Sequence, residues 1–243
     1  TPDGFPEDES VSNRVQGSIE HTVTIPEDTV EGGASVSLTL TPGFVSEAVQ
    51  GMDALFNEPT GCFEQTTSSA WPNTVVTGYL EDTNQLTPEL REKAIGLVTR
   101  GYQRLLTFES PTGGFNWWGD SALGNRILSA IFLWHLKDME TLIETDEAVK
   151  ERTLNWLLSQ QQADGSWDSG DALHSGNEVL GTTKVRTTSF IAWALAHTDW
   201  ADDEVSRAGD WLAANQPPAD DLYANALAMN ALAKIDPNSI AAS

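Results

Sequence analysis

A repeated unit of helix, turn and helix constrains the fold of this chain more than any other feature of its sequence. The stretches 105–115 (LLTFESPTGGF) and 157–167 (LLSQQQADGSW) superimpose without a gap at an offset of 52 residues. A third stretch, 211–223 (WLAANQPPADDLY), matches the second loosely at an offset near 55, with one residue inserted. Such self-similarity at a long, fixed period is typical of repeat architectures.

Two kinds of helix alternate within the repeat. The segments 90–105 and 149–157 carry apolar residues at helical spacing on one face and charged residues on the other, which indicates surface helices. The segments 127–134 (ILSAIFLW), 190–195 (FIAWAL) and 226–232 (ALAMNAL) are apolar nearly all round. A helix without a polar face is expected to be buried on every side.

One such unit cannot bury its own inner face, whereas neighbours stacked in a ring can. The predicted fold class is therefore all-α, an α/α toroid with two concentric layers of helices. We expect about eight helices between residues 45 and 234, fewer than a closed toroid needs, and therefore a truncated ring, incomplete at the C-terminus.

A short β segment is expected before the toroid. Residues 18–25 (SIEHTVTI) and 34–40 (ASVSLTL) alternate apolar and polar residues around the turn PEDTVEGG, and this alternation predicts a strand pair. The expected domains are thus residues 1–43, a β segment, and residues 44–243, the toroid. Because the chain starts at Thr1 without methionine, we interpret it as a piece of a longer protein.

Charge and composition exclude several functions. The 13 basic and 36 acidic residues give a formal net charge of -23, which disfavours nucleic acid as a partner. The single cysteine cannot form an internal disulfide, and four scattered histidines make no ligand cluster, so neither a metal nor a cofactor is expected. No run of eighteen apolar residues is present, so a membrane is expected only through the parent chain, if at all.

The repeat alone leaves more than one class of protein open. The spacing Gln161-x3-Gly165-x-Trp167 resembles the Gln-Trp repeat of terpene cyclases, in which the glutamine ties helix ends and the tryptophan stacks on it. A cyclase needs an acid, usually in an Asp-x-Asp-Asp motif, and this sequence has none. The acidic pairs at 202–203 and 220–221 are better explained as solvated helix starts. A toroid that only binds or spaces, with an inert cysteine, is a further alternative.

The single cysteine lies in the stretch PTGCFEQT, residues 59–66, three residues ahead of Gln65. If Cys62 and Gln65 occupy the first turn of a helix that runs through Trp71 toward Leu80, their Cβ atoms lie about 5–6 Å apart on one face. The thiol can then attack the carboxamide carbon, release ammonia and leave an internal thioester. A helix N-terminus favours the thiolate, which makes Cys62 a better leaving group when a nucleophile attacks later.

The longer stretch GCFEQTTSSAWPNTVVTGYL resembles the thioester motif of the α-macroglobulin and complement thioester-protein family, whose thioester-containing domain is an α/α toroid. Upstream VSEAVQGMDALFNEPT and downstream GGFNWWGD and DGSW are similar to the same domain, so the resemblance covers residues 44 to 235. Residues 1–43 resemble the β segment that leads in from an adjacent CUB-like domain. Phe63 departs from the glycine of vertebrate members and points to a bacterial α-2-macroglobulin, because bacterial-type members vary there.

The resemblance implies a covalent trap. In the parent protein, cleavage of a bait segment would expose the thioester, and a nucleophile on the target would displace Cys62 and become bonded to Gln65. This is single-turnover chemistry, so we expect a protease inhibitor or defence module and not an enzyme. The implied partners are target proteases or surface nucleophiles and the other domains of the parent, in an extracytoplasmic setting, periplasmic or secreted. Without those covering domains, the Cys62 thiol is expected to be free and exposed or half-exposed.

The resemblance also implies an activating histidine. His174 lies in the loop 168–184, which is about five residues longer than the matching loop after Phe115. The family's activating histidine lies on the corresponding loop. His21, His135 and His197 are interpreted as structural residues with satisfied hydrogen bonds. Four aromatic residues at the Gly-aromatic turns are expected to serve packing and helix-end closure: Phe115, Trp117, Trp118 and Trp167.

Overall fold

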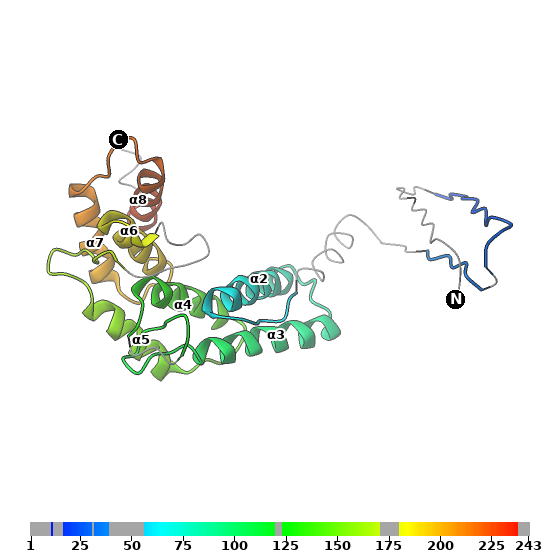
Figure 1. Cartoon of the computed structure of the whole chain (residues 1–243), viewed down its shortest axis with the longest axis horizontal. Coiled ribbons are helices and arrows are strands. Elements are labelled where there is room, and N and C mark those ends of the chain that lie inside the picture. Colours follow the sequence, from blue (N-terminus) through cyan, green and yellow to red (C-terminus); the bar gives the residue numbers. More distant parts are fainter. Residues whose placement is uncertain are drawn as a thin grey trace. The chain divides into compact units, whose positions relative to one another are not determined.

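The computed structural model describes residues 11, 17–30, 32–38, 56–119, 123–170 and 180–237. Contacts divide the chain into two units, residues 1–46 and 47–243 (Figure 1). The domain boundary expected between residues 43 and 44 lies outside the described residues and stays a prediction.

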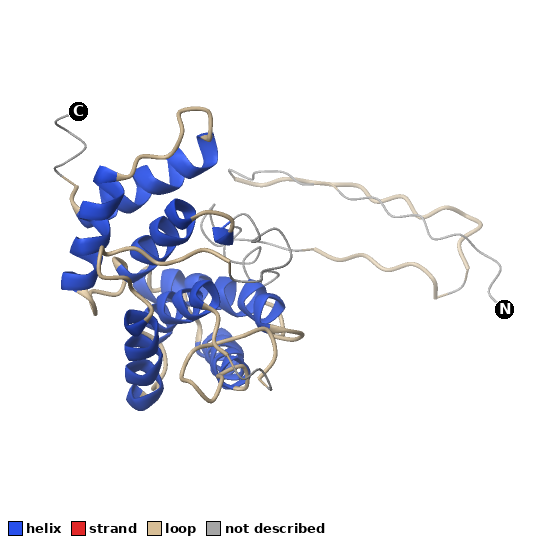
Figure 2. Cartoon of the chain, turned by 60° about the vertical axis from the view of Figure 1, so that its left-hand side comes forward, coloured by secondary structure: helices blue, strands red, loops and turns tan. Residues whose placement is uncertain are grey.

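The described residues of the first unit do not form the predicted strand pair. Residues 17–30 and 32–38 form no strand, and their described backbone hydrogen bonds close only two local turns, Thr29 N–H to Pro26 O and Gly33 N–H to Val30 O (Figure 2). The apolar side chains that were expected to face a core, such as Ile19 and Leu38, are exposed. An isolated two-stranded hairpin is marginal without a surface to pack on, so the alternating pattern alone does not form a sheet.

The described residues of the second unit form seven helices, so the predicted all-α class is confirmed. They are α2 (Phe63–Asp82), α3 (Pro88–Leu106), α4 (Arg126–Met139), α5 (Glu147–Ser159), α6 (Lys184–Leu195), α7 (Asp202–Ala214) and α8 (Leu222–Ile235). The inner helices α2, α4, α6 and α8 pack each on the next, and α3, α5 and α7 pack outside them, which gives the two layers of an α/α toroid (Figure 1).

The helices begin where the sequence supplies caps. The side chains of Thr87, Asn125, Asp146, Thr183 and Asp221 each accept a backbone N–H at the start of the following helix. The acidic pair at 202–203 lies in the first turn of α7, where carboxylates favour the helix dipole. These acidic residues are helix starts, as predicted.

The inner helices are buried as predicted, with one exception. Helices α4 and α6 contribute much of the apolar core, including Phe132, Leu133 and Ile191. Helix α8 packs on α6 and α7 and buries only alanines, while Leu222 and Met229 on its other face are 78% and 59% exposed. The prediction that α8 is buried on every side is therefore wrong. Single apolar side chains such as these are common at protein surfaces, so an apolar run alone does not show that every face is covered.

The repeated turns of the sequence are also equivalent in structure. Gly113 and Gly165 both adopt left-handed backbone angles, with φ of 97° and 91°. Each turn closes through the same backbone bonds, Ser110 N–H to Gly114 O and Gln162 N–H to Ser166 O, both 2.7 Å long. The aromatic residue that follows each turn, Phe115 or Trp167, is fully buried, which confirms its predicted packing role.

Candidate functional site

The candidate site lies at the start of inner helix α2. Cys62 is the N-cap residue and is half-buried, and Gln65 occupies the third helical position and is exposed. The Cys62 N–H donates a hydrogen bond of 3.1 Å to Oε1 of Gln65, so the carboxamide folds back over the helix start. The helix that was predicted from these two residues is present, and the free and accessible thiol stays a prediction.

Gly61 makes room for this arrangement. Its φ of 85° lies in the left-handed region that side chains disfavour. A Cβ at residue 61 would lie 2.1 Å from Oε1 and 2.8 Å from Cδ of Gln65. The carboxamide therefore occupies the space that any other residue at position 61 would fill.

The site is itself a copy of the repeated turn. PTGCF at 59–63 aligns with PTGGF at 111–115 at the same offset of 52 residues, so Gly61, Gly113 and Gly165 are equivalent. All three glycines have left-handed backbone angles. Cys62 takes the place of Gly114 and Ser166, and Phe63 the place of Phe115 and Trp167. The sequence analysis missed this copy, although the identity of four residues in five would have revealed it.

Phe63 anchors the turn in the core. It is fully buried, and its ring centroid lies 6.0 Å from those of Phe108 and Phe115. Its N–H donates to the carbonyl oxygen of Trp117 at 3.4 Å, so the loop after the second turn lies against the start of α2. Trp117 is buried as predicted, whereas Trp118 is 61% exposed and the predicted packing role is wrong for it.

Asn73, in the aromatic-Pro-Asn part of the motif, holds the segment that leads into the turn. Its Oδ1 accepts from the Asn57 N–H at 3.0 Å, and its Nδ2 donates to the Asn57 carbonyl at 2.8 Å. Asn73 is fully buried. Close approach of α3 supports the same region, since a Cβ at Gly101 would lie 2.7 Å from Cβ of Ala70.

Two arginines of α3 hold the turn from outside. Arg100 forms a bidentate pair with Glu58, with bonds of 2.7 and 2.9 Å, and its hydrogen bond holds the pKa of the Glu58 carboxyl below its usual value. Arg104 donates through Nε to the Gly61 carbonyl at 3.1 Å, and its Nη2 donates to the same oxygen. These contacts link residues more than forty positions apart, and no local pattern could have predicted them.

The described histidines differ from one another in their surroundings. His174 lies outside the described residues. His21 is exposed, and Nδ1 of His197 forms a bond of 2.7 Å with Trp193 O. His135 is buried, its Nδ1 has no hydrogen-bond partner, and its ring stacks on Trp71. The prediction of satisfied hydrogen bonds is therefore wrong for His135, whose pKa burial lowers to about 3.

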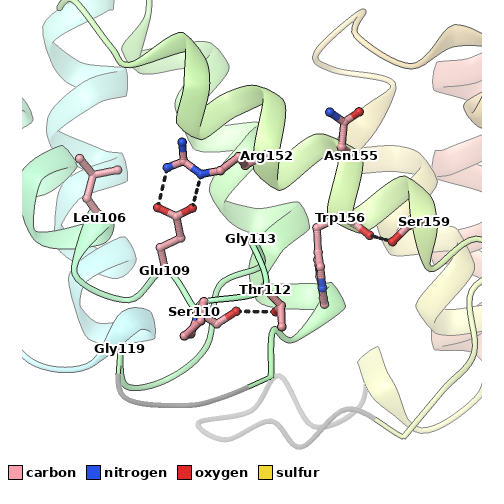
Figure 3. Close-up of a pocket in the computed structure, with 11 residues that line it drawn as sticks. Leu106, Glu109, Ser110, Thr112, Gly113, Gly119, Arg152, Asn155, Trp156 and Ser159 are labelled. Atoms are coloured by element: carbon pink, nitrogen blue, oxygen red, sulfur yellow. Dashed lines mark hydrogen bonds and ion pairs between the residues drawn. The ribbon is translucent and has the colours of Figure 1, made fainter.

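A hollow of about 800 Å³ lies beside the second turn and not beside Cys62 (Figure 3). Within it, Arg152 and Glu109 form a bidentate pair with bonds of 3.0 and 3.1 Å. Trp156 lies against the turn, since a Cβ at Gly114 would meet its ring at 2.6 Å. The hollow is therefore lined by the second copy of the turn, whose first copy carries the candidate site.

Neither a metal cluster nor a membrane span is found in the part of the chain that the structure describes. No group of three or more His, Cys, Asp and Glu side chains there could hold a metal ion. None of the helices found there combines the length and the apolar character that crossing a bilayer requires.

The second unit is a toroid of paired helices, and one of its inner helices begins with Cys-x-x-Gln. This arrangement is that of a thioester-type domain. The family model described as the A-macroglobulin TED domain matches residues 16–243, and the chain belongs to this family. This match favours the thioester-type toroid over the terpene-cyclase alternative. The family model also matches residues 16–43. The predicted link from these residues to a CUB-like domain stays a prediction.

Three relatives support this assignment. The chain is 30% identical over 151 residues to Alpha-2-macroglobulin-like protein 1 of Mus musculus, covering 62% of this chain and 10% of that protein. It is 30% identical over 148 residues to Ovostatin of Gallus gallus, covering 60% and 10%. It is 29% identical over 175 residues to Thioester-containing protein 1 allele S3 of Anopheles gambiae, covering 70% and 13%. The chain thus spans only about a tenth of the length of these relatives. The bacterial origin expected from Phe63 stays a prediction.

Proposed function

We propose that Cys62 and Gln65 form an internal thioester, and that this chain is the covalent-trap domain of a larger α-macroglobulin-like protease inhibitor. The observation that carries the proposal is the hydrogen bond of 3.1 Å from the Cys62 N–H to Gln65 Oε1 over the face of Gly61. This bond holds the carboxamide at the same helix end as the thiol. The family match supports the same chemistry.

Trapping proceeds by acyl transfer. A target amine or hydroxyl attacks Cδ of Gln65, the bond between Cδ and Sγ breaks, and Sγ leaves as a thiolate that accepts the proton of the nucleophile. The new amide or ester joins the target to Gln65. Each site reacts once, so the domain acts as a single-turnover trap and not as an enzyme.

The proposed targets are proteases or surface nucleophiles that are captured after cleavage of a bait segment. The parent is proposed to be periplasmic or secreted, because a thioester survives poorly among the abundant nucleophiles of a reducing cytosol. The net charge of -23 is compatible with this setting and disfavours nucleic acid as a target.

His174 is proposed as the residue that selects the nucleophile. Attack of its imidazole on Cδ of Gln65 would release the Cys62 thiolate and give an acyl-imidazole that is reactive enough for hydroxyl groups. The test is His174→Ala in the full-length protein, activated by a protease in the presence of glycerol and of methylamine. We expect loss of glycerol transfer with methylamine transfer retained. Unchanged partitioning between the two nucleophiles would exclude the role.

Intact mass tests the thioester itself. Freshly purified full-length protein is expected to be lighter by one ammonia than its sequence mass, and methylamine treatment should release one titratable thiol. The Cys62→Ala variant is the control and should show neither change. A sequence mass with a freely titrating thiol in the fresh full-length protein would instead support an inert toroid.

A further inference from the structure

The copies of the turn at 59–63, 111–115 and 163–167 differ at one position of the outer helix that follows each of them. In each copy an arginine precedes this position by four residues and contacts a side chain one or two residues ahead of the turn: Arg100 with Glu58, Arg152 with Glu109, and Arg207 with Gln161. Four residues on, the second and third copies carry tryptophan. Trp156 lies against Gly114, and Trp211 Nε1 donates to Asp164 Oδ2 at 3.1 Å.

The first copy alone carries arginine there. Arg104 corresponds to Trp156 and Trp211, and it places two donors on the Gly61 carbonyl. Figure 3 shows the second copy, in which Trp156 occupies this place beside Gly113. The substitution coincides with the only copy that contains a cysteine.

The Gly61 carbonyl and the Cys62 N–H belong to one peptide unit. Because that unit is planar, an arginine that fixes the direction of the carbonyl also fixes the direction of the N–H. The N–H donates to Gln65 Oε1 at 3.1 Å. A continuous path of hydrogen bonds therefore runs from the Arg104 guanidinium through the Gly61–Cys62 peptide to the Gln65 carboxamide, and a charged donor at one end polarises the next bond.

We propose that the Cys62 N–H is the oxyanion donor for thioester chemistry at Gln65, and that Arg104 is the positioning residue that aims it. This inference rests on the proposed thioester. When Sγ of Cys62 attacks Cδ of Gln65, negative charge develops on Oε1, the atom that already accepts the Cys62 N–H. The Sγ–Cδ bond forms, the Cδ–Nε2 bond breaks, and the thiol proton leaves with Nε2 as ammonia. The same donor serves the later attack by a target nucleophile, which again places negative charge on Oε1.

The chemical test uses Arg104→Met, Arg104→Lys and Arg91→Met in the full-length protein. Methionine keeps an apolar stem and removes the donors, and lysine restores one charged donor. Arg91→Met removes an ion pair with Glu81 at the start of the same helix, away from the turn. We expect Arg104→Met to slow thioester formation, measured by the loss of ammonia in intact mass, by about tenfold. We expect Arg104→Lys to recover part of the rate and Arg91→Met to keep the full rate.

The structural test uses a Cys62→Ala background, in which no thioester can form. Hydrogen exchange at the residue-62 amide should become about tenfold faster when Arg104→Met is added, and should stay unchanged with Arg91→Met. Unchanged exchange with Arg104→Met would overturn the inference, and so would faster exchange with an unchanged rate of thioester formation. Absence of a thioester in the unsubstituted protein would instead refute the proposed function, while the exchange experiment would still decide whether Arg104 aims this amide.

Discussion

Gly61 and Gln65 are in direct contact, and the space that glycine leaves free is the space that the glutamine carboxamide occupies. A Cβ at residue 61 would lie 2.1 Å from Gln65 Oε1. The glycine of the motif thus serves both the left-handed turn and the placement of the acyl group. A substitution of Gly61 would therefore disturb both the backbone of the turn and the position of the Gln65 carboxamide.

Gly61→Ala is therefore expected to prevent thioester formation, because the new methyl group displaces the carboxamide. The backbone strain at a φ of 85° should also lower the free energy of unfolding by about 1–3 kcal/mol. Gly113→Ala is the matched control. It carries the same kind of strain at a φ of 97° in the second turn, but its nearest neighbour is Arg152 O at 3.2 Å. A thioester that forms in Gly61→Ala and is lost in Gly113→Ala would contradict the assignment.

Phe63 is predicted to be the main packing anchor of the site. Phe63→Ala removes a fully buried ring from between Phe108 and Phe115, and should lower the free energy of unfolding by about 3–5 kcal/mol. Trp118→Ala removes a larger but exposed ring and should change it by less than about 1 kcal/mol. Denaturant unfolding of the chain measures both. Equal losses would show that the first turn is not anchored through Phe63.

Asn73 is expected to set the path of the chain into the turn. Asn73→Ala leaves the Asn57 N–H and carbonyl without the amide that bridges them, at a cost of about 1–3 kcal/mol in the free energy of unfolding. Hydrogen exchange at the Asn57 amide should become faster. Asn230→Ala, which removes one bond to Ala226 O on the exposed side of α8, is the control. If Asn57 exchange is unaffected by Asn73→Ala, the bridge does not hold this segment.

The helices were predictable because their determinants are local. Apolar spacing predicted the helices that contain Leu97 and Phe132, and in the structure both helices begin at local caps, Thr87 and Asn125. The toroid followed from the repeat, since units that cannot bury their own inner face must stack. The pair Cys62 and Gln65 followed from helical spacing and from the motif.

The features that were predicted wrongly or not at all have a common physical origin, because each depends on contacts between distant segments. Alternation at 18–25 and 34–40 describes side-chain faces, but a hairpin also needs a surface that covers one of them. The apolar run of α8 includes Met229, which is exposed, because single apolar side chains are common at a protein surface and do not require burial. The contacts of Arg104 and Asn73 depend on how distant segments pack, so the support of the site appears only in three dimensions.

The last prediction concerns acid stability and rests on His135. Its ring is buried, stacks on Trp71 with centroids 5.3 Å apart, and has a pKa lowered by desolvation to about 3. The unfolded chain binds a proton at this residue near pH 6.5, whereas the folded chain does not until near pH 3. The folded state therefore loses stability as the pH falls through this window, because protons are taken up by the unfolded state.

His135→Phe retains a stacked ring and removes this proton uptake. The loss of unfolding free energy between pH 7 and pH 5 should then be smaller than in the unsubstituted chain by about 2 kcal/mol. The hydrogen bond of 3.0 Å from Trp71 Nε1 to Asp138 is present in both proteins. Urea unfolding at both pH values measures the difference. If the unfolding free energies of His135→Phe and of the unsubstituted chain change with pH in parallel, burial does not lower the pKa of His135.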